Sequence, residues 1–251
     1  MHPHLNVAID TIRLGGKKLI SIFNNLSNKN FISNDDFLLY LNSSVGLIMF
    51  NNINKIYPNH LIVDKFNHDS LLVKDKFIWI INILDGYYNF IHGIPRFSLS
   101  IAIMKNFLIE NSVIYSPITE ELFFSSKGEC SQMNGNRIRI SNNFSSDNYI
   151  IGFYSDTIVG NFKKIDFMKK IISNNMKVRE FGSLNLDIAY TSLGRLDAFL
   201  AFDVSLLDIC AGDLLMREAG GLITNFDYKF LNKNSDIFTG NPKLYNCILK
   251  L

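Results

Sequence analysis

Cysteine, proline and tryptophan are scarce in this 251-residue chain, which has three, five and one of them. The cysteines are Cys130, Cys210 and Cys247, and they show no CxxC or Cys/His spacing of a zinc site. An odd number of cysteines also argues against a disulfide framework. We therefore expect a reducing compartment, the cytoplasm.

The chain also lacks an excess of positively or negatively charged residues. The 25 basic and 23 acidic residues leave a formal charge of +2. This balance argues against a strongly basic nucleic-acid binder, so any RNA contact would come from a local patch or through a partner. Because hydrophobic residues make up 47% of the chain, it has enough material for a core and is not disordered.

Long apolar runs are absent as well. We find no uninterrupted apolar stretch of the roughly 18 residues that a membrane span needs. Residues 1–6 contain no lysine or arginine, and Asp10 and Arg13 interrupt the next segment, where a signal peptide would be uniformly apolar. We expect neither a signal peptide nor a transmembrane helix.

Mixed helical and strand patterns fill the chain, which favours a layered α/β or α+β fold. Helices are predicted at 5–24, 38–53, 160–175, 182–193 and 207–219. Strands are predicted at 61–63, 77–84, 97–104, 108–115, 121–126, 134–140, 149–154, 198–202 and 222–225, the last being the final strand. Residues 25–36 are predicted to be a loop, with Asp35 and Asp36 in solvent. The polar stretch 141–148 predicts a boundary between halves of about 1–145 and 146–251 in a single domain.

The sharpest local signal is the segment 79–90, in which a buried strand ends at Asp85-Gly86 and turns into a possible helix. Such a turn can aim a carboxylate and free backbone groups at an anion or a metal. An ordinary Asp-Gly turn explains the segment equally simply. A second signal is Asp203 and Asp208 ahead of the helix 207–219, where helix capping is the simpler explanation. The five histidines show no ligand spacing, and the cysteines suit buried apolar packing.

Taken in order along the chain, these pieces resemble the inositol monophosphatase family over essentially its whole length. The matching pieces are Tyr57-Pro58, the block 79–90, 94–100, 121–123, Asn134-Gly135, Gly182-Ser183, Leu186-Asp187, 194–197, Asp208, 217–221 and 240–242. The resemblance implies a five-layer α/β/α/β/α sandwich and a homodimer. It also implies Mg²⁺-dependent hydrolysis of a phosphate monoester, in which a metal-bound water attacks phosphorus and a second metal stabilises the leaving oxygen.

The resemblance implies the site residues position by position. The metal and catalytic positions would be Asp85, the Leu84 carbonyl, Asp208, Asn82, Lys65 and Asn42. The substrate-binding positions would be Gly86, Tyr87, Arg179, Gly182, Ser183 and Asp213. For Arg179, a surface ion pair with Glu180 or Asp187 is an alternative.

Several of these positions depart from the family pattern. Asn82 stands where the family has the first Asp of its Asp-Pro-x-Asp-Gly-Thr motif, Tyr87 where it has the Thr, and Lys65 where it has a Glu. Asn42 stands at an Asp that orients the water. A one-residue slip would instead place Asp64 at the Glu position. One unit charge at about 4 Å is worth roughly 4 kcal/mol at an effective dielectric of 20, so these changes should weaken Mg²⁺ binding severely.

The fold-forming features match while the metal ligands do not, which indicates that the fold is needed and hydrolysis is not. The resemblance is strongest to bacterial family members implied to act in transcription antitermination on ribosomal RNA operons. Their implied partners are the RNA polymerase elongation complex, the Nus factors and nascent rRNA. We predict this role together with ribosome biogenesis. The alternatives are a working Mg²⁺-dependent inositol-1-phosphate phosphatase with a rearranged metal site, and a decaying copy without a role.

Overall fold

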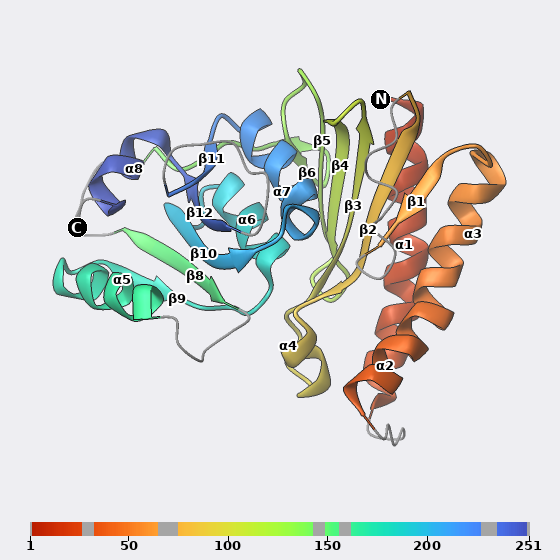
Figure 1. Ribbon diagram of the computed structural model, residues 1–251, viewed down its shortest axis with the longest axis horizontal. Helices are drawn as coiled ribbons and strands as arrows, with labels where there is room; N and C mark the ends of the chain where they lie inside the picture. The colour runs from red at the N-terminus through yellow and green to blue at the C-terminus, as the bar shows by residue number, and fades with distance from the viewer. Residues whose placement is uncertain are drawn as a thin grey trace.

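The computed structural model describes residues 2–26, 33–64, 75–142, 149–155, 162–226 and 235–249. Two β-sheets and three groups of helices alternate in five layers (Figure 1). Helices α1, α2 and α3 cover the outer face of the first sheet, α6 and α7 lie between the sheets, and α5 and α8 lie beyond the second sheet. The predicted five-layer fold is confirmed.

The described helices are α1 (Pro3–Asn24), α2 (Asn34–Leu41), α3 (Leu47–Ile56), α4 (Tyr87–Ile91), α5 (Phe162–Ser173), α6 (Leu184–Ser192), α7 (Leu206–Glu218) and α8 (Pro242–Leu249). A π-helical turn, Asn42–Gly46, joins α2 to α3. The first sheet runs in the order β1 (Leu61–Val63), β2 (Phe77–Asp85), β3 (Ser98–Lys105), β4 (Leu108–Ser116), β5 (Glu121–Ser126), β6 (Gln132–Met133) and β7 (Asn136–Arg137). The second runs β11 (Leu222–Asn225), β12 (Ser235–Gly240), β10 (Ala198–Val204), β8 (Ile150–Ser155) and β9 (Lys177–Arg179).

Strand β2 is covered on both faces, which explains why its sequence is nearly continuously apolar. Trp79 and Ile81 pack with the outer helices, whereas Ile78 and Ile80 pack in the cluster shared with α6 and α7. Because successive side chains of a strand point to opposite faces, a strand covered on both faces must be apolar at nearly every position. The same burial fixes its register, with Ile81 opposite Ile101 of β3.

Most predicted elements are confirmed, and the errors fall where the pattern is short or polar. The predicted loop 25–36 is wrong at its end, because the Ser33 hydroxyl accepts the backbone N–H of Asp36 and starts α2 there. Asp35 and Asp36 therefore lie in a first helical turn. The predicted strand 134–140 is reduced to a two-residue strand, β7. Residues 27–32, 143–148 and 160–161 of the predicted loop, boundary and helix lie outside the described residues.

Four further differences concern the second half and the cysteines. Strand β9, strand β12 and helix α8 were not predicted, so 222–225 is not the last strand. Cys210 is buried as expected, whereas Cys247 is exposed.

None of the helices in the described ranges is both long and apolar enough to cross a bilayer.

Candidate functional site

Asp85 is the last residue of β2, and its side chain turns inward instead of toward solvent. Only 7% of the residue is exposed. Gly86 follows with φ +90°, a left-handed conformation that lets the chain turn at once into α4. The local sequence therefore places a carboxylate at a buried strand end, beside the start of α6.

Four donors fill the Asp85 carboxylate. The Ser183 hydroxyl donates to Oδ2 at 2.6 Å, and the Asn185 backbone N–H donates to the same oxygen at 2.8 Å. The Leu184 backbone N–H donates to Oδ1 at 3.1 Å, and the Ser98 hydroxyl donates to Oδ2 at 3.2 Å. Two of these donors are first-turn amides of α6, which otherwise lack partners, so Asp85 caps that helix from another layer.

Burial and hydrogen bonding act in opposite directions on Asp85. Burial raises the pKa of its carboxyl above the ordinary value, and the four hydrogen bonds oppose this by stabilising the charged form. Burial is the larger of these effects on the pKa. Three of these bonds go to Oδ2 and one goes to Oδ1, so Oδ2 is saturated while Oδ1 accepts a single hydrogen bond.

Close backbone packing surrounds this carboxylate. A Cβ on Gly86 would lie 2.8 Å from the carbonyl oxygen of Arg96 and 3.3 Å from that of Gly182. The Asn89 amide donates to the carbonyls of Arg96 and Phe181 at 2.8 and 2.7 Å. One side chain thus joins α4, the segment before β3 and the segment before α6.

Asn82 and Leu84 lie on either side of an irregularity in β2. Asn82 pairs with Ser100 and Asp85 with Ser98, so β2 has one more residue than β3 between these pairs. Such bulges often redirect side chains near sites. The Asn82 Oδ1 accepts the Leu84 backbone N–H at 3.2 Å, so it is already engaged within its own strand.

Asp208 lies in the first turn of α7, and Ser205 is the N-cap of that helix. The Ser205 hydroxyl donates to Asp208 Oδ2 at 2.5 Å, and the Asp208 backbone N–H donates back to Ser205 Oγ at 3.3 Å. The sequence suggested Asp208 as the cap, whereas in the structure Ser205 caps the helix and the Asp208 carboxylate supports Ser205 by accepting its hydroxyl. The Asn185 amide donates to the Asp208 carbonyl at 2.7 Å, which joins the starts of α6 and α7.

A cavity of about 350 Å³ brings many of the predicted positions together. It is lined by Asn82, Leu84, Asp85, Gly86, Tyr87, Tyr88, Asn89, Tyr154, Ser155, Glu180, Gly182, Leu184 and Asp208. Ser183 joins this group through its bond to Asp85. Burial raises the pKa of Tyr87, as do Tyr88 and Asp35 nearby. We refer to this space as the Asp85 cavity.

Other predicted positions lie elsewhere. Asn42 and Asp64 line a separate cavity of about 440 Å³ beside α3. Arg179 is exposed on β9, and its guanidinium donates to the Val178 carbonyl. Neither predicted ion pair of Arg179 forms, because Glu180 pairs with Lys164 and the ion-pair partner of Asp187 is Arg96.

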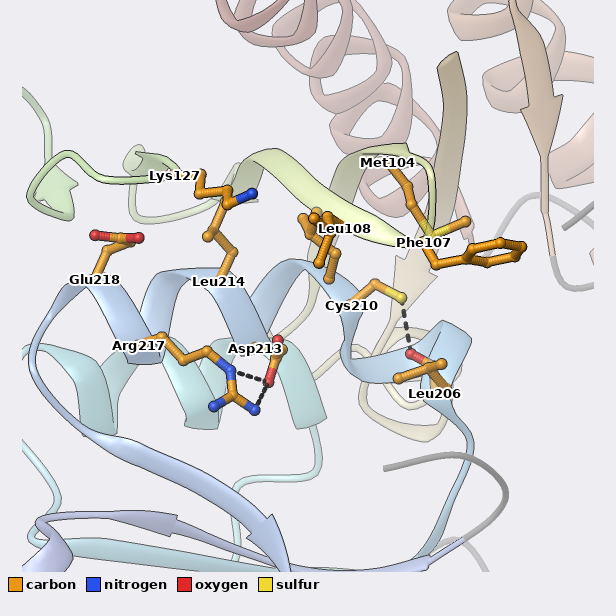
Figure 2. A pocket seen from close by; sticks show the side chains of 11 residues that line it. Met104, Phe107, Leu108, Lys127, Leu206, Cys210, Asp213, Leu214, Arg217 and Glu218 are labelled. Carbon is orange, nitrogen blue, oxygen red and sulfur yellow. Dashed lines mark hydrogen bonds and ion pairs between the residues drawn. The ribbon is translucent and has the colours of Figure 1, made fainter. Parts of the chain in front are cut away.

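Asp213 lies in a third cavity, between the β3–β4 hairpin and α7 (Figure 2). There its carboxylate pairs with Arg217, one turn further along α7, at 2.8 Å. The structure therefore does not bring Asp213 to the Asp85 cavity. Lys65 lies outside the described residues.

These residues do not fit a magnesium site. The described ranges hold no group of three His, Cys, Asp or Glu side chains arranged around a metal. Asp85 Oδ2 already accepts three hydrogen bonds, Asp208 accepts the hydroxyl of the N-cap Ser205, and Asn82 carries no charge. Mg²⁺ needs near-octahedral oxygen ligands and gives up water reluctantly, and a Mg²⁺ on Oδ2 of Asp85 would have to displace the hydrogen bonds from Ser183 and Asn185 at the start of α6.

Sequence reasoning missed the residues that hold Asp85. Ser98 and Asn185 were assigned no role, although Ser98 lies in the matching piece 94–100, and they reach Asp85 from 13 and 100 residues away. A usable signal existed only for Ser183, which stands at the N-cap position of α6. Its neighbour Gly182 adopts φ +77°, which permits the sharp entry into that helix.

The fold and the site geometry define a class of protein, and direct comparison agrees with it. The inositol monophosphatase family matches residues 1–251, and this chain belongs to that family. The solved structure of extragenic suppressor protein suhB from Bartonella henselae is 26% identical, with a TM-score of 0.86, and covers 99% of this chain and 98% of that one. An IMPase from Thermotoga maritima is 25% identical with a TM-score of 0.83, over 99% and 96% of the chains.

The most similar sequences point to one branch of the family. The chain is 38% identical over 234 residues to Nus factor SuhB of Buchnera aphidicola subsp. Schizaphis graminum, covering 90% of this chain and 85% of that protein. It is 34% identical over 255 residues to Nus factor SuhB of Buchnera aphidicola subsp. Baizongia pistaciae, covering 99% and 96%. Nus factor SuhB of Escherichia coli K12 is 31% identical over 263 residues, covering 99% and 95%.

Proposed function

We propose that this protein is a SuhB-like Nus factor that acts in processive rRNA transcription antitermination and ribosome biogenesis, with a degraded phosphatase site. Its proposed partners are the RNA polymerase elongation complex, the other Nus factors and nascent rRNA. It would act in the cytoplasm as a homodimer. The names of its relatives support the class of function.

The hydrogen bonding of Asp85 is the observation that supports a degraded phosphatase site. Its carboxylate stands at a family metal position but is filled by two hydroxyls and two helix amides. The side chain therefore serves the fold. A protein that retains the layers of an enzyme and uses the metal carboxylate as a helix cap fits a role in assembly better than one in hydrolysis.

Hydrolysis of inositol 1-phosphate, followed from micromolar to tens of millimolar Mg²⁺, tests the loss of enzymatic function. We expect the natural chain to be inactive and the Lys65→Glu/Asn82→Asp variant to gain turnover. The matched control is Lys177→Glu/Asn136→Asp, which makes the same charge changes at two exposed positions. Clear Mg²⁺-dependent turnover by the natural chain would overturn the degraded-site part of the proposal and favour the phosphatase.

Retention on a stalled RNA polymerase elongation complex carrying rRNA antitermination sequences and the Nus factors tests the partner assignment. We expect the natural chain and Asp208→Asn to be retained equally, because neither partner binding nor the helix cap needs the charge of Asp208. Asp85→Asn is unsuitable here because it would loosen α6. Failure of the folded natural chain to be retained at micromolar concentration would overturn the assignment.

A further inference from the structure

A fourth cavity, of about 640 Å³, lies between α1 and strands β4 and β5. It is lined by Ile9, Arg13, Lys17, Tyr115, Glu120, Leu122, Phe124, Asn134 and Gly135, and we call it the α1 cavity. It shares no lining residue with the Asp85 cavity. Its floor is apolar and buried, because Ile9, Leu122 and Phe124 are 6%, 4% and 7% exposed. Its volume is within the range of small-molecule sites.

Two cations on its wall lack partners. Arg13 and Lys17 are one helical turn apart on α1, so they share a face. Both are exposed, and neither forms an ion pair or hydrogen bond with any described residue. Five basic side chains, those of Arg96, Lys127, Lys164, Arg195 and Arg217, are paired with a carboxylate, whereas Lys18 and Lys177, like Arg13 and Lys17, form no ion pair with any described residue.

An aromatic ring is fixed beside these cations. A Cβ on Gly16 of α1 would lie 2.7 Å from Cε1 of Tyr115, so the missing side chain is what allows the ring to pack directly on the helix. Burial raises the pKa of Tyr115, Glu120 raises it further and Arg13 lowers it, so both charges act on its hydroxyl. The ring, the guanidinium and the carboxylate thus face a common space.

Polar groups complete the opposite wall. Asn134 is held by its own backbone N–H, which donates to the Leu122 carbonyl at 2.8 Å, and by its Oδ1, which accepts the Leu122 N–H at 2.9 Å. Its Nδ2 donor has no partner within the described ranges. Glu120 adopts φ +54°, a left-handed conformation that costs a non-glycine residue roughly 1–2 kcal/mol. Such strain is concentrated at functional sites.

We propose that the α1 cavity binds the phosphate of a ribonucleotide, either free or within a single strand of RNA. Arg13 and Lys17 hold the phosphate oxygens, because a guanidinium and an ammonium one turn apart suit an anion with several acceptors. The Tyr115 ring and the apolar floor contact the base, and Glu120 and the Asn134 amide face the ribose hydroxyls. Cations that follow a backbone beside an aromatic surface are the usual elements of single-strand binding. The choice of RNA as the biological source rests on the proposed function, whereas the site itself does not.

Fluorescence anisotropy with a labelled 12-nucleotide single-stranded RNA at low salt, with AMP as competitor, tests the proposal. We expect Arg13→Gln/Lys17→Gln to weaken binding by roughly tenfold or more, as loss of charge-assisted bonds predicts. The slope of log affinity against log salt should fall by about 1 to 2. Glu120→Gln should tighten binding, because it removes the negative charge from the cavity.

Lys18→Gln is the matched control. It removes one positive charge, against two in the test variant, at the position of α1 that follows Lys17, and Lys18 does not line the cavity. Its affinity should stay within about twofold of the natural chain. Circular dichroism should show that all variants are folded.

The outcomes separate the possibilities. Displacement of RNA by AMP at equal concentration assigns the site to free nucleotides, and displacement only by RNA assigns it to the strand; both support the proposal. Absence of binding of either ligand at millimolar concentration, or equal weakening by Lys18→Gln, overturns it. If the natural chain joins the elongation complex but binds neither ligand, this inference fails and the proposed function stands. If the natural chain binds RNA or AMP but does not join the elongation complex, the α1 cavity is a ligand site and the proposed function fails.

Discussion

The Asp85 carboxylate accepts the backbone N–H of Asn185 at 2.8 Å, across 100 residues of chain. Asp85 ends a strand of the first sheet, and Asn185 lies in the first turn of a helix between the two sheets. The residue that the family resemblance implied as a metal ligand therefore holds the middle layer to the first sheet. Stability, and not catalysis, should respond most strongly to a change at this residue.

Asp85→Asn should lower the free energy of unfolding by about 3 kcal/mol, because an amide oxygen in place of Oδ2 leaves the amide NH₂ facing the Leu184 backbone N–H and bonds the other donors without the charge of a carboxylate. Urea unfolding measures this loss. Asp208→Asn is the comparison, since its cap can be retained by an amide oxygen, and it should cost less than about 1 kcal/mol. Equal stability of Asp85→Asn and the natural chain would contradict the capping role.

Glycine substitutions test how closely the backbone packs around the same carboxylate. Gly93→Ala places a methyl group in open space at φ +72°, so its cost should be the backbone strain alone, roughly 1–2 kcal/mol. Gly86→Ala adds a contact 2.8 Å from the Arg96 carbonyl at φ +90° and should cost clearly more. Thermal unfolding of the two variants gives the comparison. A Gly86→Ala protein as stable as Gly93→Ala would show that the turn has room for a Cβ.

The ion pair of Arg96 and Asp187 allows a double-mutant cycle. Asp187 is 1% exposed, and the pair is 3.7 Å apart. Burial raises the pKa of Asp187 well above its ordinary value, against the effect of Arg96. Removal of Arg96 alone, as in Arg96→Met, should cost about 3–5 kcal/mol, because it leaves Asp187 buried without its cation.

The double variant Arg96→Met/Asp187→Leu should recover most of that loss, since apolar replacement of a buried pair is often neutral. Chemical denaturation of the two single variants and the double variant completes the cycle. Additive losses, with no recovery in the double variant, would show that the two residues do not act as a pair.

His4 should make stability depend on pH. Its ring packs against Phe77, Tyr57 and His60, with centroids 4.3, 4.9 and 5.3 Å away. Its pKa is lowered from 6.5 to about 4, first by burial and then by the charges of His2, His60 and Lys105. The unfolded chain therefore binds a proton at higher pH than the folded chain, so the contribution of His4 is complete above pH 6.5 and is lost as the pH falls toward 4.

The pH effect is measured as a difference between two proteins. His4→Phe keeps the aromatic packing and removes the titration, so its unfolding free energy should fall less than that of the natural chain between pH 6.5 and 4.5. Subtraction cancels the carboxyl groups that titrate in the same range. Parallel curves for the two proteins would place the pH dependence elsewhere.

Elements with a strong periodic pattern were predictable from sequence, and the contacts of the site were not. The continuous apolar run of β2 followed from burial on both faces, and the Asp85–Gly86 turn marked its end. The partners of Asp85 come from β3 and α6, and no local pattern encodes which distant amides a carboxylate will meet. Strand β9 has three residues and β12 follows a polar stretch, so neither shows an alternating apolar pattern long enough to be recognised as a strand. Helix α8 was detectable, since Pro242 stands at its start and Leu244 and Ile248 fall four residues apart.

The helices of the middle layer, α6 and α7, are synthesised after the first sheet that they cover. Asp85 leaves the ribosome about one hundred residues before the amide of Asn185, and translation at roughly 5–20 residues per second makes this an interval of about 5–20 s. Throughout that time the inner face of the first sheet, with Ile78 and Ile80, lacks α6 and α7. The nascent N-terminal half therefore presents an uncovered apolar sheet to the cell, and it needs a chaperone or rapid completion of the chain to avoid aggregation.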